Sequence, residues 1–135
     1  LQNSSNCVLN LVHPIEGKDL SDENIVKSII DSHGDILFFS RSAIPHNADI
    51  GYRQLGMIGF TAQILEQYCE LEPSQIEITE SIDMMRYIEN DIAISSLITD
   101  KQILGVDHPE DIKKVESLMA NDEWVKNYSY RFKDN

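Results

Sequence analysis

The chain has 135 residues, a length that suits one domain. Its 11 Lys and Arg residues face 23 Asp and Glu residues, which gives a formal net charge of -12. A chain this acidic repels nucleic-acid phosphates and anionic lipid, and its apolar runs are far shorter than the roughly 20 residues that cross a bilayer, so we expect neither nucleic acid nor membrane as a partner.

Six short apolar runs are predicted as strands: residues 7–12, 25–30, 36–39, 55–60, 92–98 and 103–106. For residues 25–30 the alternative is a helix that begins at Ser21, which could cap it. The strand is favoured because residues 31–35 then form the turn of a β-hairpin that leads into the next strand.

Three stretches are predicted as helices, residues 61–70, 75–90 and 109–120, because apolar side chains recur there at helical spacing. Pro109, Glu110 and Asp111 are typical of a helix start. Strands that alternate with helices predict an α/β fold. Cys7 and Cys69 lie in apolar patterns, which predicts two buried free thiols and weakly indicates a cytosolic setting.

Asp107 lies between the strand 103–106 and the helix that begins at Pro109. Ligands of open α/β sheets bind at such strand ends, and a carboxylate there could hold Mg²⁺. An N-cap aspartate would have the same placement, so both interpretations stay open. His108 is a weak zinc signal because no partner lies near it in the sequence.

An acidic edge of the helix 75–90 combines Glu77, Glu80 and Asp83, followed by Arg86. These carboxylates could accept hydrogen bonds from sugar hydroxyls, or form a solvated face with an Asp83–Arg86 ion pair.

Three cations are placed near predicted strand ends: Lys27, Arg41 and Arg53. A guanidinium can hold a carboxylate or phosphate with two parallel hydrogen bonds. The alternative is local charge balance.

Several segments resemble, in the same order, the C-terminal half of the sugar-acid cytidylyltransferases, the family of CMP-KDO synthetase. Residues 24–27 (Asn-Ile-Val-Lys) resemble its Asn-x-Val-Lys strand, and residues 38–45 (Phe-Phe-Ser-Arg-Ser-Ala-Ile-Pro) its Tyr-Phe-Ser-Arg-x-x-Ile-Pro. Residues 53–60 are similar to Arg-His-x-Gly-Ile-Tyr-x-Tyr, residues 76–86 to Leu-Glu-x-x-Glu-x-Leu-Glu-Gln-Leu-Arg, and residues 105–111 to Gly-Val-Asp-Thr-Pro-Glu-Asp. The ordered set spans about residues 8–119.

The resemblance implies a fold: the C-terminal part of a nucleotide-diphospho-sugar-transferase-like, Rossmann-like mixed sheet with flanking helices and a β-hairpin. Residues 1–120 would form the sugar-binding and dimerisation half of the cytidylyltransferase domain, and residues 121–135 a C-terminal tail. The family's N-terminal half, with its basic nucleotide loop and second metal aspartate, has no counterpart here. We therefore expect this chain alone to lack most of the CTP site and to be inactive alone.

The resemblance also implies a reaction, the Mg²⁺-dependent transfer of CMP from CTP to a KDO-like sugar acid with release of pyrophosphate. Asp107 would bind Mg²⁺, Arg41 and Arg53 the substrate's anionic groups, and Gln54, Asp83 and Glu80 sugar hydroxyls.

Four positions depart from the family pattern, in which His stands at Gln54, Tyr at Ile58, Glu at Asp83 and Gln at Met84. The sugar is therefore less well defined than the reaction. The resemblance places the reaction in the cytoplasm, in bacterial lipopolysaccharide or surface-polysaccharide synthesis, and implies a homo-oligomer. The alternative is a non-catalytic binding or assembly module derived from this fold.

Overall fold

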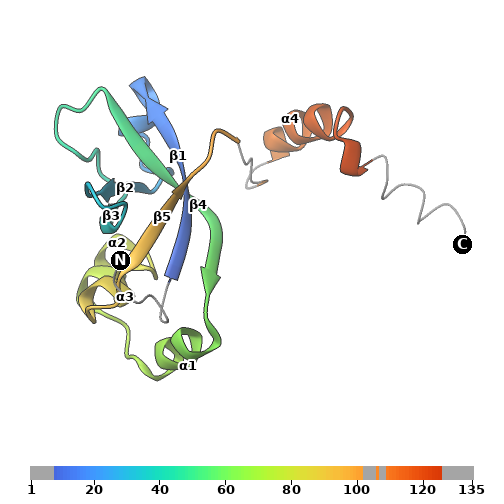
Figure 1. Ribbon diagram of the computed structural model, residues 1–135. Helices are drawn as coiled ribbons and strands as arrows, with labels where there is room; N and C mark the ends of the chain where they lie inside the picture. The colour runs from blue at the N-terminus through green and yellow to red at the C-terminus, as the bar shows by residue number, and fades with distance from the viewer. Residues whose placement is uncertain (1–7, 102–105, 107–108, 126–135) are drawn as a thin grey trace, which may run out of the picture. The chain divides into compact units, whose positions relative to one another are not determined.

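The computed structural model describes residues 8–101, 106 and 109–125 (Figure 1). They fall into two compact units, which divide between Lys101 and residue 102. The first unit contains, in chain order, β1 (Val8–Glu16), a 3₁₀ helix (Gly17–Ser21), β2 (Lys27–Ile30), β3 (Ile36–Ser40), β4 (Ile50–Phe60), α1 (Ala62–Glu70), α2 (Gln75–Glu80), α3 (Met85–Glu89) and β5 (Ile94–Ile98).

The five strands form one mixed sheet in the order β3-β2-β4-β1-β5. β1 pairs antiparallel with β4 and parallel with β5, while β2 is antiparallel to both β3 and β4. Five of the six predicted strands are thereby confirmed, although β4 begins already at Ile50 rather than at Leu55. The sixth, residues 103–106, lies outside the described residues except for Val106.

The β-hairpin between β2 and β3 is confirmed, and Asp31 stabilises its turn. The carboxylate Oδ1 of Asp31 accepts hydrogen bonds from the backbone N–H groups of His33 (2.8 Å) and Asp35 (2.9 Å). Gly34 has a φ of 90°, a conformation that favours glycine. The alternative helix from Ser21 is wrong, because Ser21 ends the 3₁₀ helix.

An irregularity in β4 is held by a fully buried asparagine of β1. The pairing of β1 with β4 shifts between Asn10 and Val12. The Asn10 amide group donates to the backbone oxygen of Leu55 at 3.1 Å, and its Oδ1 accepts from Gln54 Nε2 at 2.9 Å. Asn10 thus satisfies polar groups that the shifted strand leaves unpaired.

The single helix predicted over residues 75–90 is wrong, because the chain forms α2 and α3 with a break between them. Ser81 closes α2 in the left-handed conformation, with a φ of 55°. Such a residue ends a helix, which the apolar spacing across residues 75–90 does not reveal. Ser74 begins α2 with a reciprocal capping box to Glu77.

The core lies where the helices pack on one face of the sheet. Its buried members come from β1, β3 and β5 and from α1, α3 and the α2–α3 connection: Val8, Val12, Ile36, Phe39, Ile64, Ile82, Met84, Met85, Tyr87 and Ile94. The prediction of a buried Cys69 is wrong, since its side chain is exposed on α1. Cys7 lies outside the described residues.

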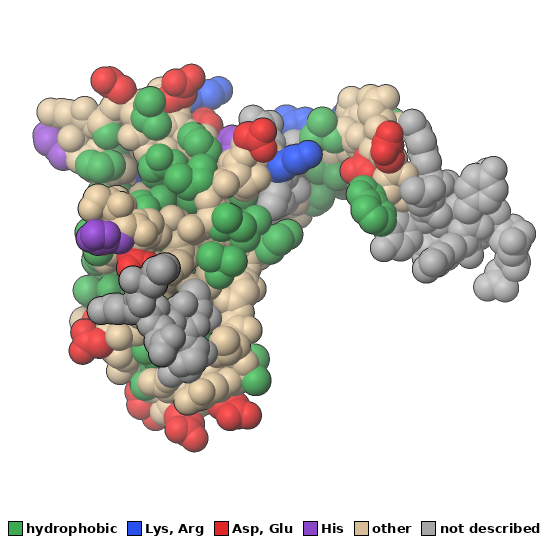
Figure 2. Space-filling model, in the orientation of Figure 1, with side chains coloured by type: hydrophobic (Ala, Val, Ile, Leu, Met, Phe, Trp, Pro, Cys, Tyr) green, Lys and Arg blue, Asp and Glu red, His purple; other side chains and the backbone are tan. Residues whose placement is uncertain are grey.

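The surface of the first unit is mixed in character (Figure 2). Hydrophobic side chains are visible over the sheet, and acidic side chains gather at the end where α1 lies. Leu97 and Ile98, on the edge strand β5, are 49% and 54% exposed. The β2–β3 turn covers the first half of this edge, through the Asp35–Ser95 bridge and the hydrogen bond from the Ser96 N–H to the Gly34 oxygen, so the apolar surface lies on the second half of β5.

The second unit contains α4 (Pro109–Met119), which confirms the predicted helix. Glu110 and Asp111 stand in its first turn, where acidic side chains are favoured by the helix dipole. The predicted division of the chain at residue 120 stays a prediction. Over the part of the chain that the structure describes, no helix has both the length and the hydropathy of a membrane span.

Candidate substrate-binding site

A row of polar side chains crosses four strands on one face of the sheet. Lys27 of β2 pairs directly with Ser40 of β3 and with Arg53 of β4, and Arg53 pairs with His13 of β1. Side chains at directly paired positions emerge on the same face. Two of the predicted cations, Lys27 and Arg53, are therefore neighbours.

Lys27 is completely buried and uses its ammonium group on the chain's own backbone. Nζ donates to the carbonyl oxygens of Asp22 (2.8 Å) and Ile25 (2.7 Å) and to that of Arg41. An ammonium group has three donors, so these contacts leave none for an external anion. The interpretation of Lys27 as an anion holder is therefore not supported.

Arg41 and Glu80 meet where β3 and α2 end. Glu80 accepts hydrogen bonds from Ser40 Oγ through both oxygens (2.9 and 3.0 Å), and its Oε2 also accepts from the backbone N–H of Arg41 at 3.1 Å. In return, Arg41 Nε donates to the backbone oxygen of Glu80 at 3.2 Å. Arg41 Nη1 donates to the backbone oxygen of Glu23. The structure thus joins two of the predicted site residues.

Arg53 and Gln54 are adjacent in β4, so their side chains emerge on opposite faces of the sheet. Gln54 pairs with buried Val12 and donates to Asn10 on the side of the core. Its backbone N–H donates to Val26 at 2.8 Å, which places it beside the start of β2. Arg53 lies on the other face, where its buried Nε has no hydrogen-bond partner in the part of the chain that the structure describes. One pocket on one face cannot contain both side chains.

Positive and negative charges are interleaved around Lys27. Burial is the main cause that lowers the pKa of Lys27, and Arg41 acts in the same direction, while Asp22, Glu23 and Glu80 oppose them. The pKa of Asp22 is lowered mainly by the backbone N–H of Asn24, with smaller contributions from Lys27 and Arg53. The three cations of this cluster, Lys27, Arg41 and Arg53, are therefore accompanied by three carboxylates, those of Asp22, Glu23 and Glu80.

The remaining predicted residues are separate from this cluster. Asp83 is exposed in the connection from α2 to α3, and its backbone oxygen accepts from the Arg86 N–H. Met84, beside it, is buried in the core, and Ile58 is half-buried against the core. Asp107, the predicted Mg²⁺ ligand, lies outside the described residues, as does His108. Among the residues whose placement is described, no three His, Cys, Asp or Glu side chains are grouped to hold a metal ion.

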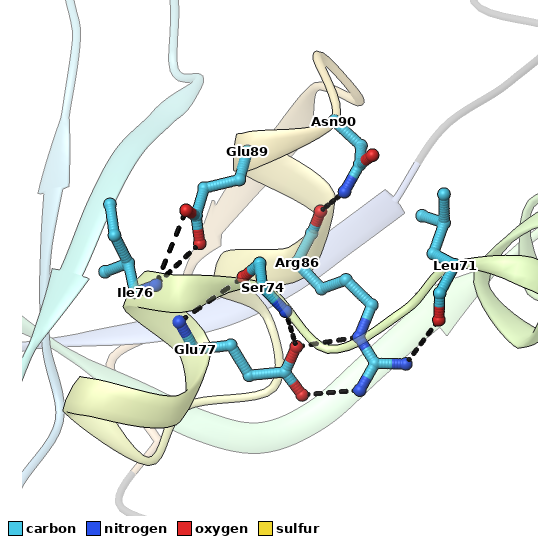
Figure 3. Close-up of polar contacts among 7 residues, drawn as sticks. All are labelled: Leu71, Ser74, Ile76, Glu77, Arg86, Glu89 and Asn90. Atoms are coloured by element: carbon cyan, nitrogen blue, oxygen red, sulfur yellow. Dashed lines mark hydrogen bonds and ion pairs between the residues drawn. The ribbon is translucent and has the colours of Figure 1, made fainter.

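Glu77 and Arg86 form a structural ion pair that joins α2 to α3 (Figure 3). Arg86 Nε donates to Glu77 Oε2 at 2.7 Å and Nη2 to Oε1 at 2.5 Å, while Nη1 donates to the Leu71 backbone oxygen. Arg86 also lies over the ring of Tyr68, 4.4 Å from its centroid. The interpretation of an Asp83–Arg86 pair is therefore wrong, and Glu77 is occupied by its partner rather than open to a sugar.

Sequence reasoning missed the connection that Ser40 makes between β3 and Glu80. A serine before Arg41 carries no spacing signal, because its partner lies 40 residues further along the chain. It also missed the burial of Lys27, whose only sequence signal is its position inside an apolar run.

The chain is similar to known enzymes over most of its length. The 3-deoxy-manno-octulosonate cytidylyltransferase of Chlorobium limicola is 34% identical over 117 residues, which cover 81% of this chain and 47% of that protein. The corresponding enzyme of Anaeromyxobacter sp. is 35% identical over 115 residues, or 82% of this chain and 47% of that protein. No protein-family model matches the chain.

A solved structure of such an enzyme is also similar to this chain in fold. The structure of CMP:2-keto-3-deoxy-manno-octonic acid synthetase complexed with CTP superimposes with a TM-score of 0.81 at 28% sequence identity, covering 87% of this chain and 51% of that chain. The α/β mixed sheet with flanking helices is therefore the nucleotide-sugar-transferase-like fold that the resemblance implied. The chain spans about half the length of the relatives that it matches. Over that half, the chain is related in sequence and in fold to the sugar-acid cytidylyltransferases, as its ordered motifs predicted.

Proposed function

We propose that this chain is the sugar-acid-binding part of a cytidylyltransferase. In the proposed reaction the anomeric hydroxyl of a sugar acid attacks the α-phosphorus of CTP. The new P–O bond gives the CMP-sugar, the bond to the β-phosphate breaks, pyrophosphate leaves, and the hydroxyl proton is lost to solvent. The nucleotide would bind through a second half of the enzyme, of the length by which the relatives exceed this chain.

One observation carries the proposal: the match to half of each cytidylyltransferase includes the junction at which Arg41 is fixed. Arg41 is half-buried, and its Nε and Nη1 are held by backbone oxygens of Glu80 and Glu23. A guanidinium fixed in this way is suited to a carboxylate, the group common to all sugar acids. Positioning of this kind contributes to the rate because the reacting groups are oriented in advance.

The other roles follow from the two faces of β4. We assign Gln54 and Asp83 to sugar hydroxyls, since Gln54 lies on the core side near the start of β2 and Asp83 is exposed after α2. Arg53 lies on the opposite face, where its Nε lacks a partner among the described residues, so we assign it to an anionic group outside the pocket that Gln54 faces. Glu80 uses both of its oxygens on Ser40 and Arg41, so its contribution to sugar binding is secondary.

Mg²⁺ is part of the proposal, with Asp107 as its ligand. A carboxylate that shares the ion with substrate phosphates is a common magnesium arrangement, and the ion would neutralise charge on the phosphates. The described residues neither contain Asp107 nor supply an alternative cluster. Support for Asp107 comes from the resemblance of residues 105–111 to the family motif.

The biosynthetic pathway, the cellular location and the oligomeric state are also part of the proposal. The product would feed bacterial lipopolysaccharide or surface-polysaccharide synthesis, and the reaction would take place in the cytoplasm. A homo-oligomer is supported by the exposed Leu97 and Ile98 on the second half of β5, beyond the part that the β2–β3 turn covers, because proteins commonly bury exposed apolar surface at a sheet edge. Light scattering that gives a monomer mass over a wide concentration range would exclude the oligomer.

The test is a pyrophosphate-release assay of the complete protein with CTP, Mg²⁺ and a panel of sugar acids. The expected result is CMP-sugar formation with one or more of them, lost on Asp107→Ala and reduced on Arg41→Ala. Lys18→Ala, an exposed cation of the 3₁₀ helix, is the control. Full turnover by the Asp107→Ala protein would remove the metal role.

The alternative function, a non-catalytic binding or assembly module, is not favoured by the comparisons, since the relatives are named as cytidylyltransferases. The same assay separates the two functions. A complete protein that binds sugar acids and forms no CMP-sugar with any of them would establish the module.

A further inference from the structure

We propose that Lys27 is a positioning residue for Arg41, fixing both the backbone from which Arg41 projects and the loop on which its guanidinium rests. This inference rests on the proposed role of Arg41 in holding the sugar acid. Lys27 itself touches no substrate in this proposal.

The first argument is that the charged side chain of Lys27 occupies a buried position where an apolar side chain would fit. Lys27 is completely buried on the sheet, and lysine is seldom fully buried because its ammonium group must leave water. An apolar side chain of similar volume would fill the same space without that cost. The charge is therefore informative, and what it contacts is three backbone carbonyl groups.

The second argument is the identity of these carbonyl groups. One belongs to Arg41, directly at the end of β3. The other two, of Asp22 and Ile25, lie on either side of Glu23, whose own carbonyl accepts the hydrogen bond from Arg41 Nη1. A single ammonium group thus fixes the start of the Arg41 side chain and the support of its far end.

The third argument is that Glu80 supplies the matching constraint from the helix side. Its carboxylate accepts from the Arg41 backbone N–H, and its carbonyl accepts from Arg41 Nε. Arg41 is therefore held between β2 and α2, with Lys27 and Glu80 acting on the same residue. Losing the Lys27 ammonium group or the Glu80 carboxylate removes a hydrogen bond that fixes the Arg41 backbone, and should thereby loosen the guanidinium while the other contacts of the sheet stay in place.

The direct test is NMR of the arginine Nε–H groups in the protein and its Lys27→Met variant. We expect a rigid Arg41 Nε–H in the parent and a mobile one in Lys27→Met, measured by the ¹⁵N heteronuclear NOE, while Arg86 Nε–H stays rigid in both. Arg86→Met is the control, because it removes a different cation, which is largely buried and is bonded to a backbone oxygen and a carboxylate. An Arg41 Nε–H that stays equally rigid in Lys27→Met would overturn the proposal.

The kinetic test is a double-mutant cycle of Lys27→Met with Arg41→Ala in the complete protein. Lys27→Met should raise the KM for the sugar acid about tenfold and leave the KM for CTP unchanged. In the Arg41→Ala background it should add less than about twofold, because Lys27 acts through Arg41. Additive effects, or an equal KM rise in Arg86→Met, would show a merely structural role.

Failure of the proposed function and failure of the Lys27→Met variant to fold can each be distinguished from failure of the positioning role. If the parent protein forms no CMP-sugar, the proposed function fails, and the NMR measurement still decides whether Lys27 positions Arg41. If Lys27→Met does not fold, Glu80→Ala replaces it in both tests, since alanine has no side-chain acceptor for the Arg41 backbone N–H. A Glu80→Ala protein with an unchanged Arg41 Nε–H and an unchanged sugar-acid KM would then refute the joint positioning of Arg41 by Lys27 and Glu80.

Discussion

Replacing Glu77 with glutamine should destabilise the first unit by about 2–3 kcal/mol. The change removes the charge that holds Arg86 and puts an N–H donor opposite another donor, in a pair whose side chains are only 12% and 15% exposed. Breaking a fully buried pair costs about 3–5 kcal/mol, and charged hydrogen bonds contribute about 1.5–3 kcal/mol each. The remaining solvent access of this pair brings the expected cost below the value for a fully buried pair, to about 2–3 kcal/mol.

The pH dependence of this loss is a second part of the same prediction. The hydrogen bonds from Arg86 hold the pKa of Glu77 below its usual range. In the unfolded chain the carboxyl group titrates at about pH 4.3, so the ionised Glu77 contributes fully to the free energy of unfolding above that pH. The contribution is lost as the pH falls through the lower pKa of the folded state. The parent and Glu77→Gln should therefore differ most from about pH 5 upward and converge in acid.

The assay is urea-induced unfolding followed by far-UV circular dichroism at pH 7 and at pH 3, with Glu72→Gln as the control because Glu72 is exposed. A loss of 2–3 kcal/mol corresponds to a fall of about 8–12 °C in Tm. If Glu77→Gln and Glu72→Gln agree within about 0.5 kcal/mol at pH 7, the ion pair contributes nothing and the reasoning is refuted.

Three other substitutions or reactions test the fold. Asn10→Ala should cost about 2–3 kcal/mol in urea unfolding, because the Leu55 carbonyl and the Gln54 amide lose their partner, whereas an unchanged midpoint would contradict the account of β4. Ser81→Gly should stabilise by about 0.5–1 kcal/mol in the same assay, since glycine adopts the φ of 55° without strain; a loss of stability would argue against the left-handed break. Cys69 should react with a thiol reagent in the folded protein at the rate of an exposed thiol, and protection until unfolding would place it in the core.

Much of the sheet could be predicted from the sequence, because its signals are local. The hairpin of β2 and β3 needed only a β-branched run and the Asp31–Gly34 turn chemistry. The helix break could not be predicted in the same way. Ile82 and Met85 continue the apolar spacing of α2, and both are buried, although Ser81 has already turned the chain. Periodicity reports which side chains face the core and says little about the backbone between them.

The residues of the candidate site were proposed from the sequence, and their mutual geometry could be predicted only in part. Arg41 and Glu80 came from the ordered motifs, and the structure joins them. The interpretations of Lys27 and of Arg86 failed because their partners are backbone carbonyl groups and a carboxylate nine residues away. No spacing rule along a strand or helix brings those groups together, since they depend on how the elements pack.

The alternation of Arg53 and Gln54 across β4 has a consequence for how the site can change. Gln54 shares a hydrogen bond with Asn10, which in turn holds the irregular part of β4. A new side chain at position 54 must therefore suit the interior of the sheet as well as any sugar. Arg53, on the other face, carries no such link to Asn10. Substrate preference that depends on position 54 would thus change together with position 10, while position 53 is tied instead to its neighbours Lys27 and His13 on the other face.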